Sequence, residues 1–156
     1  IYLTDGRSEN HRFNFISAEL VGTMYSQRGD DLACRPDMEL KFHYESTLDG
    51  EKRTRRVAVE VELTGKKNWE MDIKFHRLSQ NFDFVFFYCS AAAFKNAVQT
   101  RIEAGSVPIY RKRQQGSGFF PVTDAAGKPQ MHKLKHLQFH VERMRLGKCF
   151  CLPRSL

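Results

Sequence analysis

Two stretches decide the fold of this chain, RPDMELKFHY at residues 35–44 and VAVEVEL at residues 57–63. In both, apolar and polar residues alternate with a period of two, which is the pattern of a β-strand with one buried face. Asp49-Gly50 lies between them, and this dipeptide is a strong signal for a two-residue hairpin turn. The sequence therefore predicts a β-hairpin centred on Asp49-Gly50.

The predicted turn sets which residues face each other across the hairpin. The apolar residues share one face, and on the other face Asp37 lies opposite Glu62 and Glu39 lies opposite Glu60. Carboxylates that face each other destabilise a sheet, and a cation between them relieves the repulsion. A metal site is one explanation of this pattern, and an ordinary solvent-exposed hairpin face is the other.

Carboxylate oxygens are the ligands that Mg²⁺ and Mn²⁺ prefer. Glu60 and Glu62 lie about 6.5 Å apart at Cα, two strand rises of ~3.3 Å, so their side chains can flank one site. A metal held in this way neutralises a phosphate and lowers the pKa of a bound water, which is the chemistry of a hydrolytic nuclease. We therefore predict Mg²⁺ or Mn²⁺ as the cofactor.

The same residues resemble a known signature. Pro36-Asp37, followed by a turn, an apolar strand and Glu60-Val61-Glu62, is similar to the PD-(D/E)xK motif of nucleases with the restriction-endonuclease-like fold. The resemblance implies that Asp37 and Glu60 bind the metal. It also implies that Glu19, on a helix predicted before the hairpin, is an auxiliary metal-binding acid.

One position departs from that signature, because Glu62 stands where the family usually has its catalytic lysine. Some members carry a glutamate there, and others move the lysine elsewhere. Lys66, Lys67 and Lys74 are the candidates to replace it, Lys74 because a helix that starts near Asn68 turns it back toward the acids. The catalytic set that the resemblance implies is Asp37, Glu60, Glu62, Lys66 and Lys74.

The longer string VEVELTGKK at residues 59–67, with a charged helix after it and His11 near the start, resembles the replication-relaxation family of plasmid proteins. That group is similar to the MOBC class of mobilisation relaxases, and the resemblance covers roughly residues 11–110. It implies a nickase that acts at the transfer origin of a plasmid, together with accessory mobilisation proteins. Because no tyrosine stands beside a histidine cluster, we expect direct hydrolysis.

Length, charge and cysteine content predict the number of domains, the kind of partner and the cellular compartment. The 156 residues predict a single nuclease-like domain, 1–156, with a core at about 8–110 and a basic extension at 111–156. The formal net charge of +7 indicates an anionic partner, for which DNA is the natural candidate. The few, irregularly spaced cysteines and the lack of a signal peptide or a membrane span predict a reduced, cytoplasmic protein.

The remaining elements follow from periodicity and from helix caps. A helix is expected over residues 8–27, since Phe13, Ile16 and Leu20 recur at helical spacing. After the hairpin we expect a helix from about 68 to 79, a strand covered on both faces at 82–89, a helix at 91–104 and a short edge strand at 107–110. Residues 131–146 fit a helix or a strand. This order predicts an α/β fold, a mixed β-sheet flanked by helices, that is restriction-endonuclease-like.

A basic run at Arg111, Lys112 and Arg113 leads into QQGSG at 114–118. This stretch predicts a mobile loop that binds phosphates, and a solvated loop without that role is the alternative. Lys67 is predicted as a further DNA contact.

The favoured function is a metal-dependent DNA endonuclease. A catalytically silent DNA-binding module of replication or relaxosome assembly is the main alternative, because the usual lysine is replaced. A basic RNA-binding or protein-interaction domain with structural acids is the third.

Overall fold

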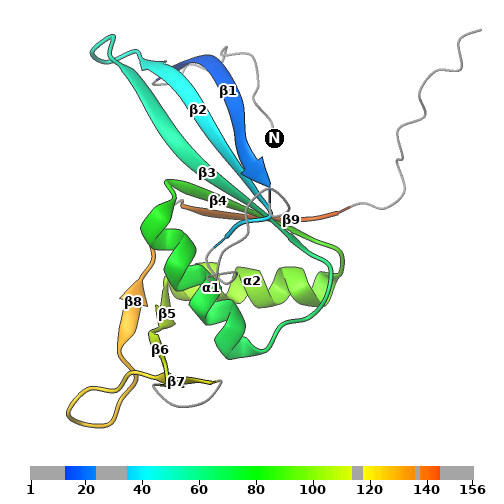
Figure 1. Ribbon diagram of the computed structural model, residues 1–156, viewed down its shortest axis with the longest axis vertical. Coiled ribbons are helices and arrows are strands. Elements are labelled where there is room, and N and C mark those ends of the chain that lie inside the picture. The colour runs from blue at the N-terminus through cyan, green and yellow to red at the C-terminus, as the bar shows by residue number, and fades with distance from the viewer. Residues whose placement is uncertain (1–12, 24–34, 114–117, 136–137, 145–156) are drawn as a thin grey trace, which may run out of the picture.

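In the computed structural model, five strands form a mixed sheet and two helices cover one of its faces (Figure 1). The structure describes residues 13–23, 35–113, 118–135 and 138–144. The sheet order is β1-β2-β3-β4-β9. The pairs β1–β2 and β2–β3 are antiparallel, and the pairs β3–β4 and β4–β9 are parallel. The bounds of these strands are β1 Phe13–Thr23, β2 Met38–Ser46, β3 Lys52–Glu62, β4 Phe84–Cys89 and β9 Phe139–Arg143.

The parallel part of the sheet is connected through helices. Helix α1, Asn68–Asn81, joins β3 to β4, and helix α2, Ala92–Ala104, follows β4. Two small two-stranded sheets come next, one from β5 Ser106–Pro108 with β8 Met131–Lys133 and the other from β6 Tyr110–Lys112 with β7 Phe119–Pro121. The predicted α/β class and mixed sheet are thus confirmed, as are the positions of α1, β4 and α2.

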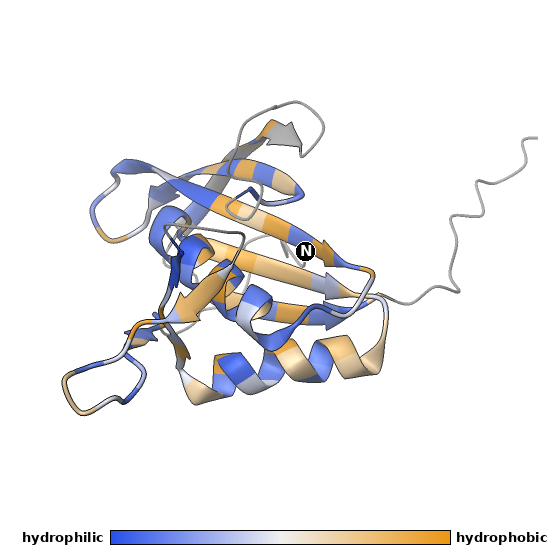
Figure 2. Cartoon of the chain, turned by 60° about the horizontal axis from the view of Figure 1, so that its bottom comes forward, coloured by the Kyte–Doolittle hydropathy of each residue, from blue (hydrophilic) through white to orange (hydrophobic). Residues whose placement is uncertain are grey.

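The hydrophobic core lies between the helices and one face of the sheet. Phe75 of α1 stacks on Phe87 of β4 and on Phe139 of β9, with ring centroids 5.1 and 4.6 Å apart. Each such aromatic ring removes a large apolar area from water, which is the main stabilising term of a small domain. The strands in the middle of the sheet are accordingly its most hydrophobic part (Figure 2).

The opposite face of the sheet carries no helix among the described residues (Figure 1). Met38, Val61 and Phe84 on this face are 36%, 38% and 40% exposed. Among the described residues the helices flank the sheet on one side only. The expectation that the strand at 82–89 is covered on both faces stays a prediction, because the middle of this face is more buried, with Val57 and Val59 only 3% and 8% exposed. Neither described helix has the length and apolarity that crossing a bilayer requires.

The helix predicted over residues 8–27 is wrong, because Phe13–Thr23 forms strand β1 along the edge of β2. The remaining residues of that prediction lie outside the described chain. The β1–β2 register shifts between Phe15 and Ser17 and again between Leu20 and Gly22. Each bulge inserts an extra residue into the strand, so the apolar residues lose the period of two and imitate helical spacing. Pairing with β2 then decides the conformation over local preference.

The hairpin exists, but its register is shifted by two residues from the predicted one. Met38 faces Val59, and Glu39 faces Ala58. The connection is a four-residue loop at 47–50, in which the Gly50 N–H donates to the Ser46 carbonyl at 2.8 Å and Gly50 adopts a φ of 71°. A shift of two residues leaves every side chain on its predicted face, and only the cross-strand partners change.

The C-terminal region also differs from its prediction. Residues 139–143 form strand β9, which pairs with β4 and completes the main sheet, so the fold core does not stop near residue 110. The ambiguous stretch at 131–146 is a strand wherever it has regular structure among the described residues. Arg111 and Lys112 belong to β6 rather than to a loop, and the short strand expected at 107–110 lies in β5 and β6, outside the main sheet.

The positive φ of Gly50 provides a test of the hairpin loop. Gly50→Ala is expected to lower the free energy of unfolding by about 1 kcal/mol, because a side chain at positive φ is strained even though no atom crowds the position. Gly50→Asn is expected to cost less, since asparagine tolerates this conformation. Urea unfolding of the three proteins measures both effects, and equal stability of Gly50→Ala and the wild type would contradict the loop described here.

Candidate functional site

The two acids of β3 lie on the face of the sheet that the helices cover. Glu60 is 0% exposed and Glu62 is 1% exposed, and they share this face with the core residue Ala58. The explanation of these acids as part of a solvent-exposed hairpin face is therefore wrong. Because an ionised carboxylate loses its hydration on burial, each of them requires a compensating partner.

Helix α1 supplies the partner of Glu60. The Lys74 ammonium donates a hydrogen bond to Oε2 of Glu60, and the lysine side chain is only 14% exposed. The helix is oriented by its buried residues Met71, Phe75 and Leu78, which pack into the core and leave Lys74 pointing along the sheet toward β3. The structure thus brings Lys74 to the acids as predicted, and its catalytic role stays a prediction.

Asp37 reaches the same place from the residue before β2. Its Oδ2 accepts a hydrogen bond of 2.6 Å from the backbone N–H of Val61, so the chain just before the first residue of β2 is attached to β3 beside Glu60. Burial raises the pKa of Glu60 to about 7; the Lys74 ammonium opposes this rise, and the neighbouring Asp37 carboxylate adds to it. The shifted register accounts for the pairing, because it moves Asp37 from the predicted position opposite Glu62 to one beside Glu60.

One oxygen of this cluster has no partner in the described part of the structure. Oε1 of Glu60 is buried and accepts no hydrogen bond there. A buried carboxylate oxygen next to a second carboxylate fits the oxygen ligands of Mg²⁺ or Mn²⁺. Asp37 and Glu60 would hold such an ion. The described residues contain no group of three or more His, Cys, Asp or Glu arranged for a metal, so water or phosphate oxygens would complete the coordination.

Glu62 forms a second ion pair one step further along β3. Both of its oxygens accept hydrogen bonds from the Lys66 ammonium, at 2.6 and 2.7 Å. The loop that carries Lys66 lies close to α2, because a Cβ placed on Gly65 would be 3.1 Å from the ring of Phe94. Two lysine–glutamate pairs thus stand side by side on the covered face of β3.

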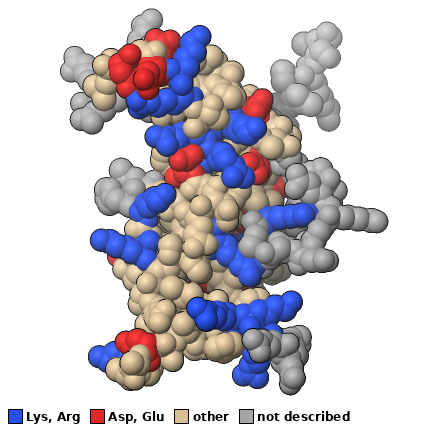
Figure 3. Space-filling view, turned by 60° about the vertical axis from the view of Figure 1, so that its left-hand side comes forward, with Lys and Arg blue, Asp and Glu red and all other residues tan. Residues whose placement is uncertain are grey.

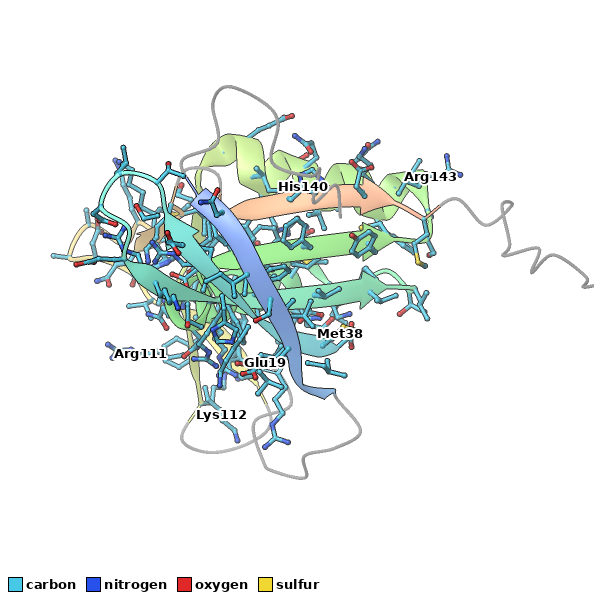
Figure 4. The ribbon with its side chains drawn as sticks, turned by 90° about the horizontal axis from the view of Figure 1, so that it is seen from above. Glu19, Met38, Arg111, Lys112, His140 and Arg143 are labelled. Atoms are coloured by element: carbon cyan, nitrogen blue, oxygen red, sulfur yellow. The ribbon has the colours of Figure 1, made fainter. Side chains whose placement is uncertain are left out.

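The structure does not bring Glu19 to this cluster. Glu19 lies on β1 (Figure 4), and its side chain is 56% exposed. It forms an ion pair with Lys41 at 3.5 Å, and the Nε2 of His43 lies 3.8 Å from the same carboxylate oxygen. Its predicted metal role depended on a helix before the hairpin, and that segment is a strand.

The predicted DNA contacts lie at the surface. Lys67 precedes α1, and its N–H donates to the Glu70 carboxylate at 2.9 Å, which caps the helix. Arg111, Lys112 and Arg113 are exposed, and Figure 4 shows the first two projecting at the edge of the molecule. Residues 114–117 of the predicted loop lie outside the described chain.

Sequence reasoning did not include the aromatic residues beside this basic run. Phe119 stacks on Trp69 of α1, and Phe120 is 40% exposed. The signal was present as two consecutive phenylalanines after a basic segment, but a sequence does not tell which of the two is buried.

Comparison with known proteins identifies no relative. No protein-family model, curated protein or solved structure matches this chain. Any functional conclusion therefore depends on the chemistry of the cluster formed by Asp37, Glu60 and Lys74.

The elevated pKa of Glu60 predicts a pH dependence of stability. Glu60 binds its proton more tightly in the folded chain than in the unfolded one, so its contribution to the free energy of unfolding falls as the pH rises from about 4.5 to about 7. The difference in this free energy between wild type and Glu60→Gln is expected to decline by roughly 1 kcal/mol per pH unit in this window.

Urea unfolding at a series of pH values measures this difference. The comparison removes the contributions of His76 and His132, whose lowered pKa values act in the opposite direction. Lys74→Met removes the ammonium that opposes the rise in the pKa of Glu60, so it should extend the decline to higher pH. A pH-independent difference between wild type and Glu60→Gln would show that Glu60 is not buried as described.

Proposed function

We propose that this protein is a metal-dependent DNA endonuclease that hydrolyses a phosphodiester bond. The observation that carries the proposal is the buried Glu60 carboxylate, with one oxygen on Lys74 and the other without a partner among the described residues, beside Asp37. A fold that needed only a stable sheet would place an apolar residue at this position, since a buried ion pair rarely adds net stability.

Each residue has a role that follows from its geometry. Asp37 and Glu60 would hold Mg²⁺ or Mn²⁺, which when bound supplies charge neutralisation of the phosphate and an activated water. Lys74 fixes Oε2 of Glu60 and leaves Oε1 available to the ion. Lys66 and Glu62 supply a second charged pair at the end of β3, where the usual motif lysine would stand.

The surface charge favours DNA as the substrate. The chain carries a formal net charge of +7, and Lys and Arg side chains are spread over the face shown in Figure 3 from one end of the molecule to the other. Lys67, Arg111, Lys112 and Arg113 would contact phosphates without reading the sequence. Within this proposal the protein is a cytoplasmic, relaxase-like nickase that acts at a plasmid transfer origin with accessory mobilisation proteins.

A DNA-binding module with a silent site is the second candidate function. The observation that favours it is that Glu60 and Glu62 each have a lysine partner already. Such pairs can hold the acids in the fold without a metal, and a proton between Glu60 and Asp37, which the raised pKa of Glu60 favours, would then satisfy the remaining oxygen of Glu60.

Nicking of supercoiled plasmid DNA tests the proposed activity. With Mg²⁺ or Mn²⁺ we expect the wild type to produce open circles, and Asp37→Asn and Glu60→Gln to reduce the rate about 100-fold or more, because each removes a charged metal ligand. Glu39→Gln is the matched control, since this carboxylate lies two residues from Asp37 but pairs with Arg56 at 2.9 Å, outside the cluster. It should retain the activity.

The same assay separates the two candidate functions. DNA binding without nicking by the wild type, with either metal, would contradict the endonuclease and favour the silent module. Equal loss of activity in Glu39→Gln and Glu60→Gln would indicate a general effect on folding rather than a metal site.

Metal binding has a readout that is independent of DNA. Mn²⁺ is expected to raise the thermal unfolding temperature of the wild type, because a ligand that binds only the folded state stabilises it. Asp37→Asn and Glu60→Gln should lose this shift, whereas Glu39→Gln should keep it. A shift of the same size in Glu60→Gln would show that Mn²⁺ binds elsewhere.

A further inference from the structure

A small basic hairpin lies at the end of the molecule opposite to the β2–β3 loop (Figure 1). Strands β6 and β7 pair antiparallel, with Arg111 opposite Phe120 and Lys112 opposite Phe119. The Arg113 N–H donates to the Gly118 carbonyl at 2.8 Å and extends the pairing by one step. We call residues 110–113 and 118–121 the basic arm.

The inner face of the basic arm is attached to α1. The ring of Phe119 stacks on Trp69 with centroids 5.6 Å apart and an angle of 27° between the planes. The Arg77 guanidinium also lies over the ring of Phe119, 5.8 Å from its centroid. Since α1 also carries Lys74, the arm is held by the same helix that completes the buried cluster.

The outer face of the basic arm presents an aromatic ring between cations. Successive residues of a strand point to opposite faces, so Phe120 points away from α1 when Phe119 points toward it. Phe120 is 40% exposed, and its cross-strand neighbour on this face is Arg111. Arg113 comes next on the same face, with its Cδ at van der Waals distance, 3.7 Å, from the Cβ position of Gly118.

The cations of the basic arm differ from those of the large hairpin. In the large hairpin Arg53, Arg55 and Arg56 each pair with a carboxylate. Among the described residues no carboxylate pairs with any of the three cations of the arm, and all three are exposed. In Figure 4, Arg111 and Lys112 extend away from the sheet into solvent. The positive charge of the arm is thus available to an external anion.

We propose that the basic arm binds a single DNA strand, with Phe120 stacked on an unpaired base and Arg111 and Arg113, the cations of the same face, on the neighbouring phosphates. An exposed ring needs an exposed base face, and a duplex buries its base faces by pairing and stacking. Grooves that bind single strands combine aromatic rings with positive charge in the same way. This inference rests on the proposed function for the identity of the polymer as DNA, and it names the form of DNA that the protein holds.

Binding in EDTA tests the arm separately from the metal cluster. The probes are a fluorescent oligo(dT) strand of about 20 nucleotides and a mixed-sequence duplex of the same length, measured by anisotropy with the full chain. Phe120→Leu keeps an apolar side chain but removes the aromatic face, and we expect it to weaken oligo(dT) binding roughly 5- to 100-fold. Phe120→Trp should retain the binding.

Two controls keep the result specific to the arm. Met131→Ala removes another exposed apolar side chain, 52% exposed on β8, and should leave oligo(dT) binding unchanged. Arg111→Gln should weaken binding of both probes, because it removes a phosphate contact that every DNA form offers. Thermal unfolding of each variant identifies any that fail to fold.

The outcomes are separable from those of the nicking assay. An unchanged oligo(dT) affinity in Phe120→Leu would overturn the inference, and so would an equal loss of affinity for the duplex, which would reduce the arm to a general cationic contact. If the wild type fails to nick but Phe120→Leu still loses oligo(dT) affinity selectively, the arm stands and the endonuclease does not. If the wild type nicks DNA but Phe120→Leu binds oligo(dT) as tightly as the wild type does, the endonuclease stands and the inference about the arm does not.

Discussion

Burial of the Glu60 carboxylate is the constraint on which the rest of this structure depends. A charge on the helix-covered face of a central strand is tolerated only with a partner in contact, because the protein interior solvates it poorly. Lys74 supplies that contact, and it reaches Glu60 only if α1 is rotated about its own axis so that Lys74 faces β3. The packing of Phe75 against Phe87 and Phe139 sets the same rotation. Apolar packing and charge compensation therefore agree on one arrangement of the helix.

The length of the β2–β3 loop has a similar influence on the acids. A four-residue loop with Gly50 at positive φ shifts the register and brings Asp37 beside Glu60, where it accepts the N–H of Val61. A two-residue turn would have placed Asp37 opposite Glu62, which already has Lys66 as its partner. The loop lies at the other end of the hairpin from Asp37 and Glu60, yet its length determines that these two carboxylates become neighbours.

The charges of the molecule fall into two kinds that match the proposed division of work. The buried acids Glu60 and Glu62 each have a lysine partner, and one oxygen of Glu60 stays without a hydrogen bond among the described residues, which suits a site that holds an ion. The exposed cations of the basic arm have no carboxylate partner among the described residues, which suits a surface that meets a polyanion. Helix α1 links the two, because it presents Lys74 to the acids and Trp69 to the arm.

The sequence by itself determined the elements whose signals are local. The helices at 68–81 and 92–104 and the strand at 84–89 were predictable from periodicity, and the Gly105 cap of α2, with a φ of 65°, from its residue type. The proximity of Asp37 to Glu60 was predictable from the motif resemblance, and that of Lys74 from the position of its helix.

Tertiary structure alone decided what depends on a distant partner. Residues 13–23 are a strand because β2 offers an edge, and 139–143 complete the sheet because β4 lies beside them. Glu60 and Glu62 are buried because both helices pack on the face of the sheet that carries them. An alternating pattern separates the two faces of a strand, but it does not predict which face the helices will cover. Glu19 was assigned to the wrong neighbours for the same reason: bulges in a paired strand imitate a helix, and only the pairing distinguishes the two.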